Sequence, residues 1–160
     1  MLDDGKIPVG LKIMEKKRVL AVLANYGTEQ LNYLEIVVKN LKSFKQYDVR
    51  VIVHSNVPLD GIKGIDELTL FEKTTGIRTL NDYLVKKKWG KKWSGRLFSF
   101  ELLPMTCRKR IDEEAMNYDY FLFSENDHLW LEHHLDKFIY YESILPKNRI
   151  AGLMQYEMSD

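Results

Sequence analysis

Two carboxylates stand close together in the second half of the chain, where Glu125 and Asp127 flank Asn126 just after the apolar run Tyr120–Phe123. Mg²⁺ and Mn²⁺ prefer oxygen ligands, and proteins often hold them with one or two carboxylates together with substrate phosphates. Acids at the end of a buried strand would point into the crevice where open α/β sheets bind ligands. The same pair could instead be solvated acids near the start of the helix expected from Leu129, because negative charge stabilises a helix N-terminus. The spacing alone leaves both interpretations open.

Three apolar runs predict the strands of a sheet. Tyr120–Phe123 is apolar at every position rather than at alternate positions, which is typical of a parallel strand covered on both faces. Arg18–Ala24 and Asp48–His54 have the same character, and the stretch between them, Glu29–Phe44, repeats leucine and valine at helical spacing. A strand, a helix and a second strand within this distance predict a βαβ unit.

The remaining expected elements complete a single α/β domain. In chain order they are an edge strand Leu68–Phe71, a short helix Leu80–Val85, a strand Leu97–Leu103, a helix Met105–Met116 with Cys107, Ile111 and Ala115 facing inward, a helix Leu129–Leu145 and a last strand Arg149–Tyr156. We therefore expect a Rossmann-like fold in which helices flank a mainly parallel sheet. Residues 18–160 would form this domain, after a lead-in of residues 1–17.

Composition narrows the class of protein. The 160 residues carry a formal net charge of +1, which argues neither for nor against binding to nucleic acid. Cys107 is the single cysteine, so an internal disulfide and a cysteine-based zinc cluster are excluded. The N-terminal residues resemble no signal peptide, and no apolar stretch approaches the ~20 residues of a membrane span, so we expect no stable membrane insertion. A cytoplasmic protein is the expectation.

Three other groups of residues could do chemistry, but each has a simpler structural explanation. The segment Lys86–Arg96 interleaves lysines with two tryptophans and is either a loop that closes over a diphosphate or, as we favour, a solvated loop. His128, His133 and His134 lack the spacing of a zinc protease and are expected to be surface helix residues. His54 ends a strand, where it could contact a ligand or cap the strand.

Three segments in the last third of the chain carry a family resemblance. The segment Leu103–Arg110 carries Leu103, Thr106 and Arg110 where a helix is expected to begin. The segment Tyr118–Asp127 ends in Glu-Asn-Asp, and Ile150–Glu157 has the sequence Ile-Ala-Gly-Leu-Met-Gln-Tyr-Glu. In order and spacing they resemble the Leu-Thr-x-x-x-Arg segment, the Asp-x-Asp motif and the Pro-Gly-Phe-x-Arg-Tyr-Glu segment of nucleotide-sugar-dependent glycosyltransferases with the GT-A fold. Asn126 stands where this family usually has an aspartate, and Ala151 and Gln155 replace its proline and arginine.

The resemblance implies a hexosyltransferase-type glycosyltransferase. Such an enzyme moves a sugar from a nucleoside diphosphate sugar to the hydroxyl of a glycan or another acceptor, uses Mn²⁺ or Mg²⁺, and has no nucleic-acid partner. The resemblance makes Asp127 the direct metal ligand, while Glu125 assists at the metal or contacts the ribose. It also implies contacts to the base and ribose from Asn25 and Tyr26, to the base from Asn56 and to the diphosphate from Arg110, with Glu157 or Asp160 as the late acids that could serve as general base.

Two alternatives stay open. The chain could be a non-catalytic nucleotide-sugar or protein-binding module of the same fold, minimal or truncated, because GT-A enzymes normally continue into segments that bind the acceptor. A nucleotidyltransferase-like enzyme would share the metal and the sheet. It would normally carry a glycine-rich basic loop after its first strand, and Asn25–Gln30 lacks one.

Overall fold

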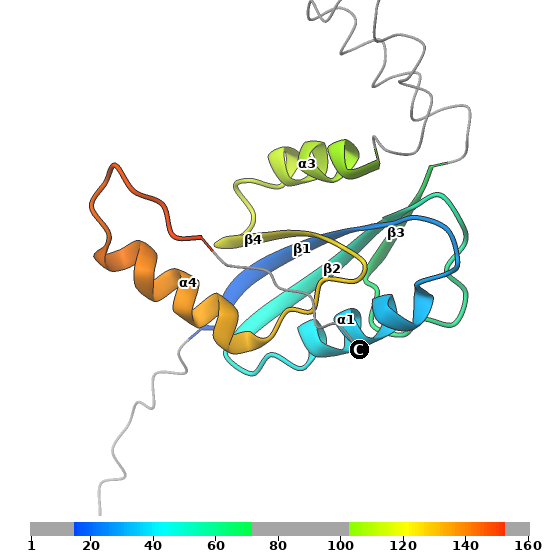
Figure 1. Cartoon of the computed structure of the whole chain (residues 1–160), viewed down its shortest axis with the longest axis horizontal. Helices are drawn as coiled ribbons and strands as arrows, with labels where there is room; N and C mark the ends of the chain where they lie inside the picture. Colours follow the sequence, from blue (N-terminus) through cyan, green and yellow to red (C-terminus); the bar gives the residue numbers. More distant parts are fainter. Residues whose placement is uncertain (1–14, 72–102, 153–160) are drawn as a thin grey trace, which may run out of the picture.

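A four-stranded parallel sheet forms the centre of the molecule (Figure 1). The computed structural model describes residues 15–71 and 103–152. The strands are β1 (Lys17–Asn25), β2 (Tyr47–Ser55), β3 (Glu67–Leu70) and β4 (Tyr120–Glu125), in the order β3-β2-β1-β4. Each neighbouring pair is parallel. The strand predicted at Leu68–Phe71 is confirmed as β3, at one edge of the described sheet.

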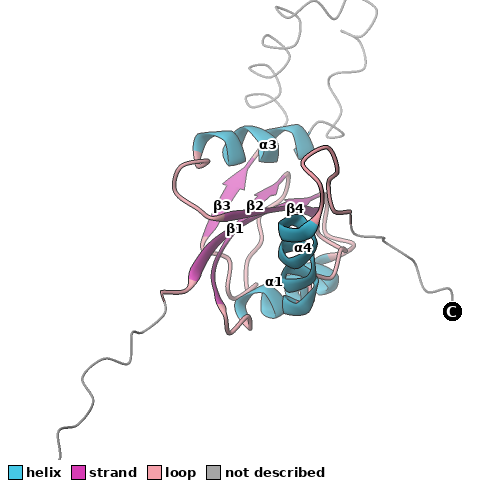
Figure 2. Cartoon of the chain, turned by 90° about the vertical axis from the view of Figure 1, so that its left-hand side faces the viewer, coloured by secondary structure: helices cyan, strands magenta, loops and turns pink. Residues whose placement is uncertain are grey.

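Helices cover both faces of this sheet. Helices α1 (Leu31–Lys42) and α4 (Glu132–Ile144) lie on one face, and α3 (Leu103–Glu113) lies on the other (Figure 2). Leu135 of α4 shares a buried cluster with the apolar residues of α1, whereas Cys107 of α3 packs in a separate cluster. The predicted α/β class, with a parallel sheet between helices, is therefore confirmed and is consistent with a Rossmann-like fold, and the GT-A fold stays a prediction.

The central strand explains why the apolar runs show no alternation. On β1, Val19, Ala21 and Leu23 pack beneath α1 and α4, whereas Leu20 and Val22 face α3. All five side chains are fully buried. Burying a valine or leucine contributes roughly 1.5–3 kcal/mol, so both faces of β1 favour the layered arrangement.

The strand order reverses between β1 and β4. The chain passes from β1 to β2 and β3 on one side, and then returns to place β4 on the other side of β1. Open α/β sheets bind ligands at such a switch point, in the crevice outside the carboxyl ends of the two strands. Ala24 pairs with Glu125 in register, so the acid pair at the end of β4 lies beside the end of β1.

Two predicted boundaries in the second half are wrong. Helix α4 begins at Glu132 rather than Leu129, because residues 126–131 form a turn and an extended stretch after β4. Helix α3 spans Leu103–Glu113 rather than Met105–Met116, so Leu103, expected to end a strand, begins the helix instead, and Ala115 is exposed rather than inward.

The predicted last strand, Arg149–Tyr156, also fails where it can be seen. Residues 149–152 are not in a strand. The backbone N–H of Ala151 instead donates to the Glu142 carboxylate of α4 at 2.6 Å. The rest of that segment, the helix Leu80–Val85, the loop Lys86–Arg96 and residues 97–102 of the predicted strand lie outside the described residues. Within residues 15–71 and 103–152, no helix is long and apolar enough to cross a membrane.

Carboxylates on α4 fasten this helix to the start of β2. The Glu132 carboxylate accepts hydrogen bonds from the backbone N–H groups of Lys45 and Gln46 at 2.8 and 2.6 Å. One turn later, Asp136 accepts a hydrogen bond of 2.6 Å from the hydroxyl of Tyr47. Burial, together with Asp136, raises the pKa of Tyr47, so this phenol stays protonated and keeps donating. The contacts fix the helix that follows the acid pair.

Replacing Tyr47 with phenylalanine tests this attachment. Tyr47→Phe removes the bond to Asp136 and leaves the ring packed, so we expect the free energy of unfolding to fall by about 1 kcal/mol. Urea unfolding followed by circular dichroism measures the change. Tyr33→Phe is the matched control, because Tyr33 is half exposed on α1. Equal midpoints for the two variants would show that the bond adds nothing to stability.

Candidate functional site

Buried polar side chains join three strands at their carboxyl ends. Asn25 ends β1, Ser55 ends β2, and Asn126 follows β4; their side chains are 0, 0 and 5% exposed. The Asn25 amide donates to the Ser55 hydroxyl at 3.0 Å and to the Gly27 carbonyl at 3.1 Å. The Asn126 amide donates to Asn25 Oδ1 at 2.8 Å. Asn25 therefore lies beneath the surface, where its side chain supports the site and does not face a nucleotide.

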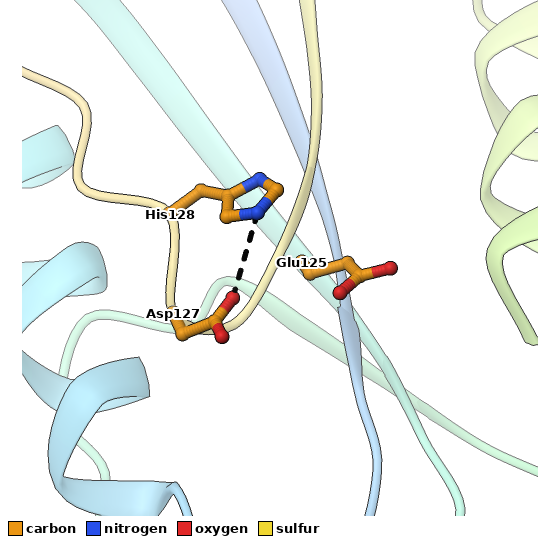
Figure 3. Close-up of side chains that lie close together, drawn as sticks. All are labelled: Glu125, Asp127 and His128. Atoms are coloured by element: carbon orange, nitrogen blue, oxygen red, sulfur yellow. Dashed lines mark ion pairs between the residues drawn. The ribbon is translucent and has the colours of Figure 1, made fainter. Parts of the chain in front are cut away.

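The acid pair stands on either side of buried Asn126. Glu125 and Asp127 are both exposed, and the backbone N–H of His128 donates to the Glu125 carbonyl at 3.4 Å, closing a turn. Figure 3 shows the side chains of Asp127 and His128 facing each other, with Glu125 beside them. His128 Nε2 lies 3.7 Å from Asp127 Oδ1, and one ligand atom from each of the three residues lies within 4.8 Å of the others.

His128 also differs from its expected place. It was expected on the surface of a helix, but the helix begins at Glu132, and His128 closes the turn that carries the acids. The signal for it was its position directly after Asp127. A strand-end turn places neighbouring side chains close together, whereas His133 and His134 lie on α4.

The loops after β1 and β2 offer two further polar side chains, Tyr26 and Asn56. Tyr26 is 62% exposed, and Gly27 adopts a φ of 71°, a left-handed conformation that favours glycine. The backbone N–H of Gly27 donates to Asn56 Oδ1 at 2.7 Å, which ties the loops after β1 and β2 together. Tyr26 and half-buried Asn56 therefore lie at the edge where the resemblance implies base and ribose contacts.

Arg110 is held by carboxylates elsewhere. Its guanidinium forms ion pairs of 3.0 Å with Glu67 and with Glu114. Glu67 begins β3, three strand spacings from β4, which corresponds to roughly 14 Å across the sheet. The structure does not bring Arg110 together with the acid pair. A diphosphate would have to compete with two carboxylates for this side chain.

His54 is the residue before the last of β2, and it lies on the face covered by α3. Its Nδ1 lies 2.7 Å from the hydroxyl of Thr106, which itself donates to the Leu103 carbonyl at 2.6 Å. Nδ1 must therefore carry the proton, and the buried Nε2 has no hydrogen-bond partner among the described residues. Burial, followed by the positive charge of Arg110, lowers the pKa of His54 to about 4. His54 therefore anchors α3 as a neutral side chain.

A cavity of about 600 Å³ lies at the opposite edge, where the strands begin. Its lining includes Arg18, Lys42, Arg50, Asp66 and Glu114. Several of these charges are already paired: Lys42 with Asp66, and Arg50 with Glu67. The cavity is remote from the carboxyl ends of the strands and does not contribute to the acid cluster.

Acid titration tests the neutral state of His54. Because its pKa lies near 4 when folded and near 6.5 in an unfolded chain, the unfolded state binds more protons between these values. The contribution of neutral His54 is complete above pH 6.5 and is lost as the pH falls to 4, by about 3 kcal/mol. Urea midpoints measured from pH 7.5 to 4 should fall less steeply in His54→Asn than in the parent. His133→Asn, on exposed α4 surface, should leave the slope unchanged; an unchanged slope in His54→Asn would contradict the burial argument.

Comparison with known proteins adds no relative. No family model, no curated protein and no solved structure matches the chain. The fold class therefore rests on the strand order and the layers, and the candidate site rests on the geometry of residues 125–128. The predicted general bases Glu157 and Asp160 lie outside the described residues.

Proposed function

We propose that this protein is a metal-dependent glycosyltransferase of the GT-A type that binds a nucleoside diphosphate sugar at the carboxyl ends of β1 and β4. One observation carries the proposal: two exposed carboxylates and an imidazole gather at the point where the strand order of a parallel sheet reverses. Acids that serve only to keep a surface solvated could lie anywhere on it. Here they stand where open α/β sheets bind ligands.

The residues at this point suit a divalent cation. Asp127 and Glu125 would hold it, with His128 as a third donor. Donors bound to one ion at about 2.1 Å lie no more than roughly 4.2 Å apart, so small rotations of exposed side chains bring the three atoms into range. Imidazole is a poor partner for Mg²⁺, so Mn²⁺ is the first ion to test. When bound, such an ion neutralises charge on the departing nucleoside diphosphate.

The chain supplies the other parts of the site. Exposed Tyr26 offers a ring to cover the base, and Asn56 offers an amide nitrogen beside it, since its Oδ1 is held by Gly27. Asn25 supports these groups from below. As the acceptor oxygen attacks the sugar, a general base must take its proton, and Glu157 or Asp160 is proposed for that role.

Calorimetry with UDP and GDP in the presence of Mn²⁺ tests the proposal. We expect one of these nucleotides to bind only when Mn²⁺ is present. Asp127→Asn and Glu125→Gln each remove one negative charge from the groups that would bind the ion, so affinity should fall roughly 10- to 100-fold. Asp112→Asn is the matched control, because Asp112 is an exposed acid on α3 that changes the net charge equally.

The outcomes separate the proposal from its alternatives. Binding that ignores Mn²⁺, or no binding of any nucleotide or nucleotide sugar in a panel, contradicts the site. Slow hydrolysis of a nucleotide sugar that disappears in Asp127→Asn supports an enzyme. Metal-dependent binding without hydrolysis or transfer favours the non-catalytic module.

A further inference from the structure

Asn126 occupies an unusual place between the two acids. Its side chain is 5% exposed, whereas Glu125 and Asp127 on either side are exposed. Its amide reaches across to β1 and donates to Asn25 Oδ1 at 2.8 Å, over a separation of 101 residues. When the middle residue of three points inward, its two neighbours are directed outward together.

The direction of this hydrogen bond is fixed by its surroundings. The Gly27 carbonyl only accepts hydrogen bonds, so the Asn25 side chain must turn its NH₂ group toward it, at 3.1 Å. The same NH₂ group donates to the Ser55 hydroxyl, which in turn donates to the Val57 carbonyl at 2.7 Å. Asn25 therefore presents its oxygen to Asn126. Residue 126 must supply a donor.

We propose that Asn126 is a positioning residue. Its amide tethers residues 125–128, the acid turn, to Asn25 and holds Glu125 and Asp127 in place for the cation. The effect on stability concerns only the hydrogen bonds that link Asn126 through Asn25 to Gly27 and Ser55, called the amide chain below. The effect on cation binding rests on the proposed function. The Asn25–Asn126 pair also accounts for the asparagine at a position where the resembling family usually has an aspartate.

An aspartate cannot make the same contact. Its ionised carboxylate accepts only, so it would face the Asn25 oxygen without a donor between them. Turning the Asn25 amide over would bring its oxygen against the Gly27 carbonyl and break that bond. A buried polar group left without a partner costs about 1–3 kcal/mol, and a charged one costs more. Glu125 and Asp127 add repulsion to a third negative charge.

The tether matters because, among the described residues, it is the side-chain hydrogen bond that joins the turn to β1; Glu125 itself pairs with Ala24 through the backbone, as the last residue of β4. The other hydrogen bonds and ion pairs described for the turn are local: the Ser124 hydroxyl donates to the Glu125 carbonyl, the backbone N–H of His128 donates to the same carbonyl, and Asp127 pairs with His128. A cation site loses affinity when supporting groups no longer hold its ligands, commonly by 10- to 100-fold.

Unfolding of three variants tests the amide chain without any ligand. Asn126→Ser keeps a hydroxyl donor, Asn126→Ala removes the donor, and Asn126→Asp keeps the shape but reverses the hydrogen-bonding character. We expect the melting temperature to fall in the order parent, Ser, Ala, Asp, with the Asp variant at least about 5 °C below the parent at pH 7.5. Asn148→Asp, in an exposed turn, is the matched control and should stay within about 1 °C. If Asn126→Asp melts at or above Asn126→Ala, residue 126 acts through its size and the proposal is overturned.

Binding of Mn²⁺ tests the positioning role. At a temperature well below each melting point, Asn126→Ala should bind Mn²⁺ with UDP or GDP about 10-fold more weakly than the parent, although both acids are intact. Unchanged affinity in Asn126→Ala, beside a loss in Asp127→Asn, would overturn the positioning role. Absence of binding in the parent would refute the proposed function, and the order of melting temperatures would still decide whether the amide chain exists.

Discussion

The whole architecture depends on the burial of β1 on both faces and both edges. Its side chains from Val19 to Asn25 are all buried, and its backbone pairs with β2 on one side and β4 on the other. Among the described strands β2 also has two strand neighbours, but β3 pairs with it only from Ile52 to Ser55, whereas β4 pairs with β1 from Val19 to Ala24. β1 is therefore the element against which α1, α3 and α4 find their places.

A strand buried this fully must satisfy its last polar residue inside the protein. At Asn25 the apolar run ends while the side chain is still fully buried, so its amide needs partners from neighbouring chain segments. Ser55, Gly27 and Asn126 supply them. The same requirement that stabilises the end of the central strand thus brings the loops after β1, β2 and β4 together. The candidate site is built on that contact.

The sequence was most informative where one local pattern decides the structure. Unbroken apolar runs predicted β1, β2 and β4, and helical spacing predicted α1, because burial on two faces or one face leaves a direct trace in the residue types. The acid pair was found by its place after a strand. The start of α4 was not, since residues 128–131 carry no sequence feature that separates an extended stretch from a helix. The roles of Asn25 and Arg110 depend on partners far away in the chain, Asn126 for one and Glu67 for the other, and no local pattern reveals them.

The pairing of β1 with β4 has a consequence for how the protein folds. Ala24 and Glu125 are register partners although about a hundred residues separate them, so this pairing closes the longest loop among the described strands. Closing a long loop costs chain entropy before its contacts repay it, and such non-local pairing slows folding. The βαβ unit of β1, α1 and β2 can form earlier, because its partners are near in the chain. The acid turn forms only after β4 has docked on β1, so a folding intermediate that holds only the βαβ unit would lack the candidate cation site.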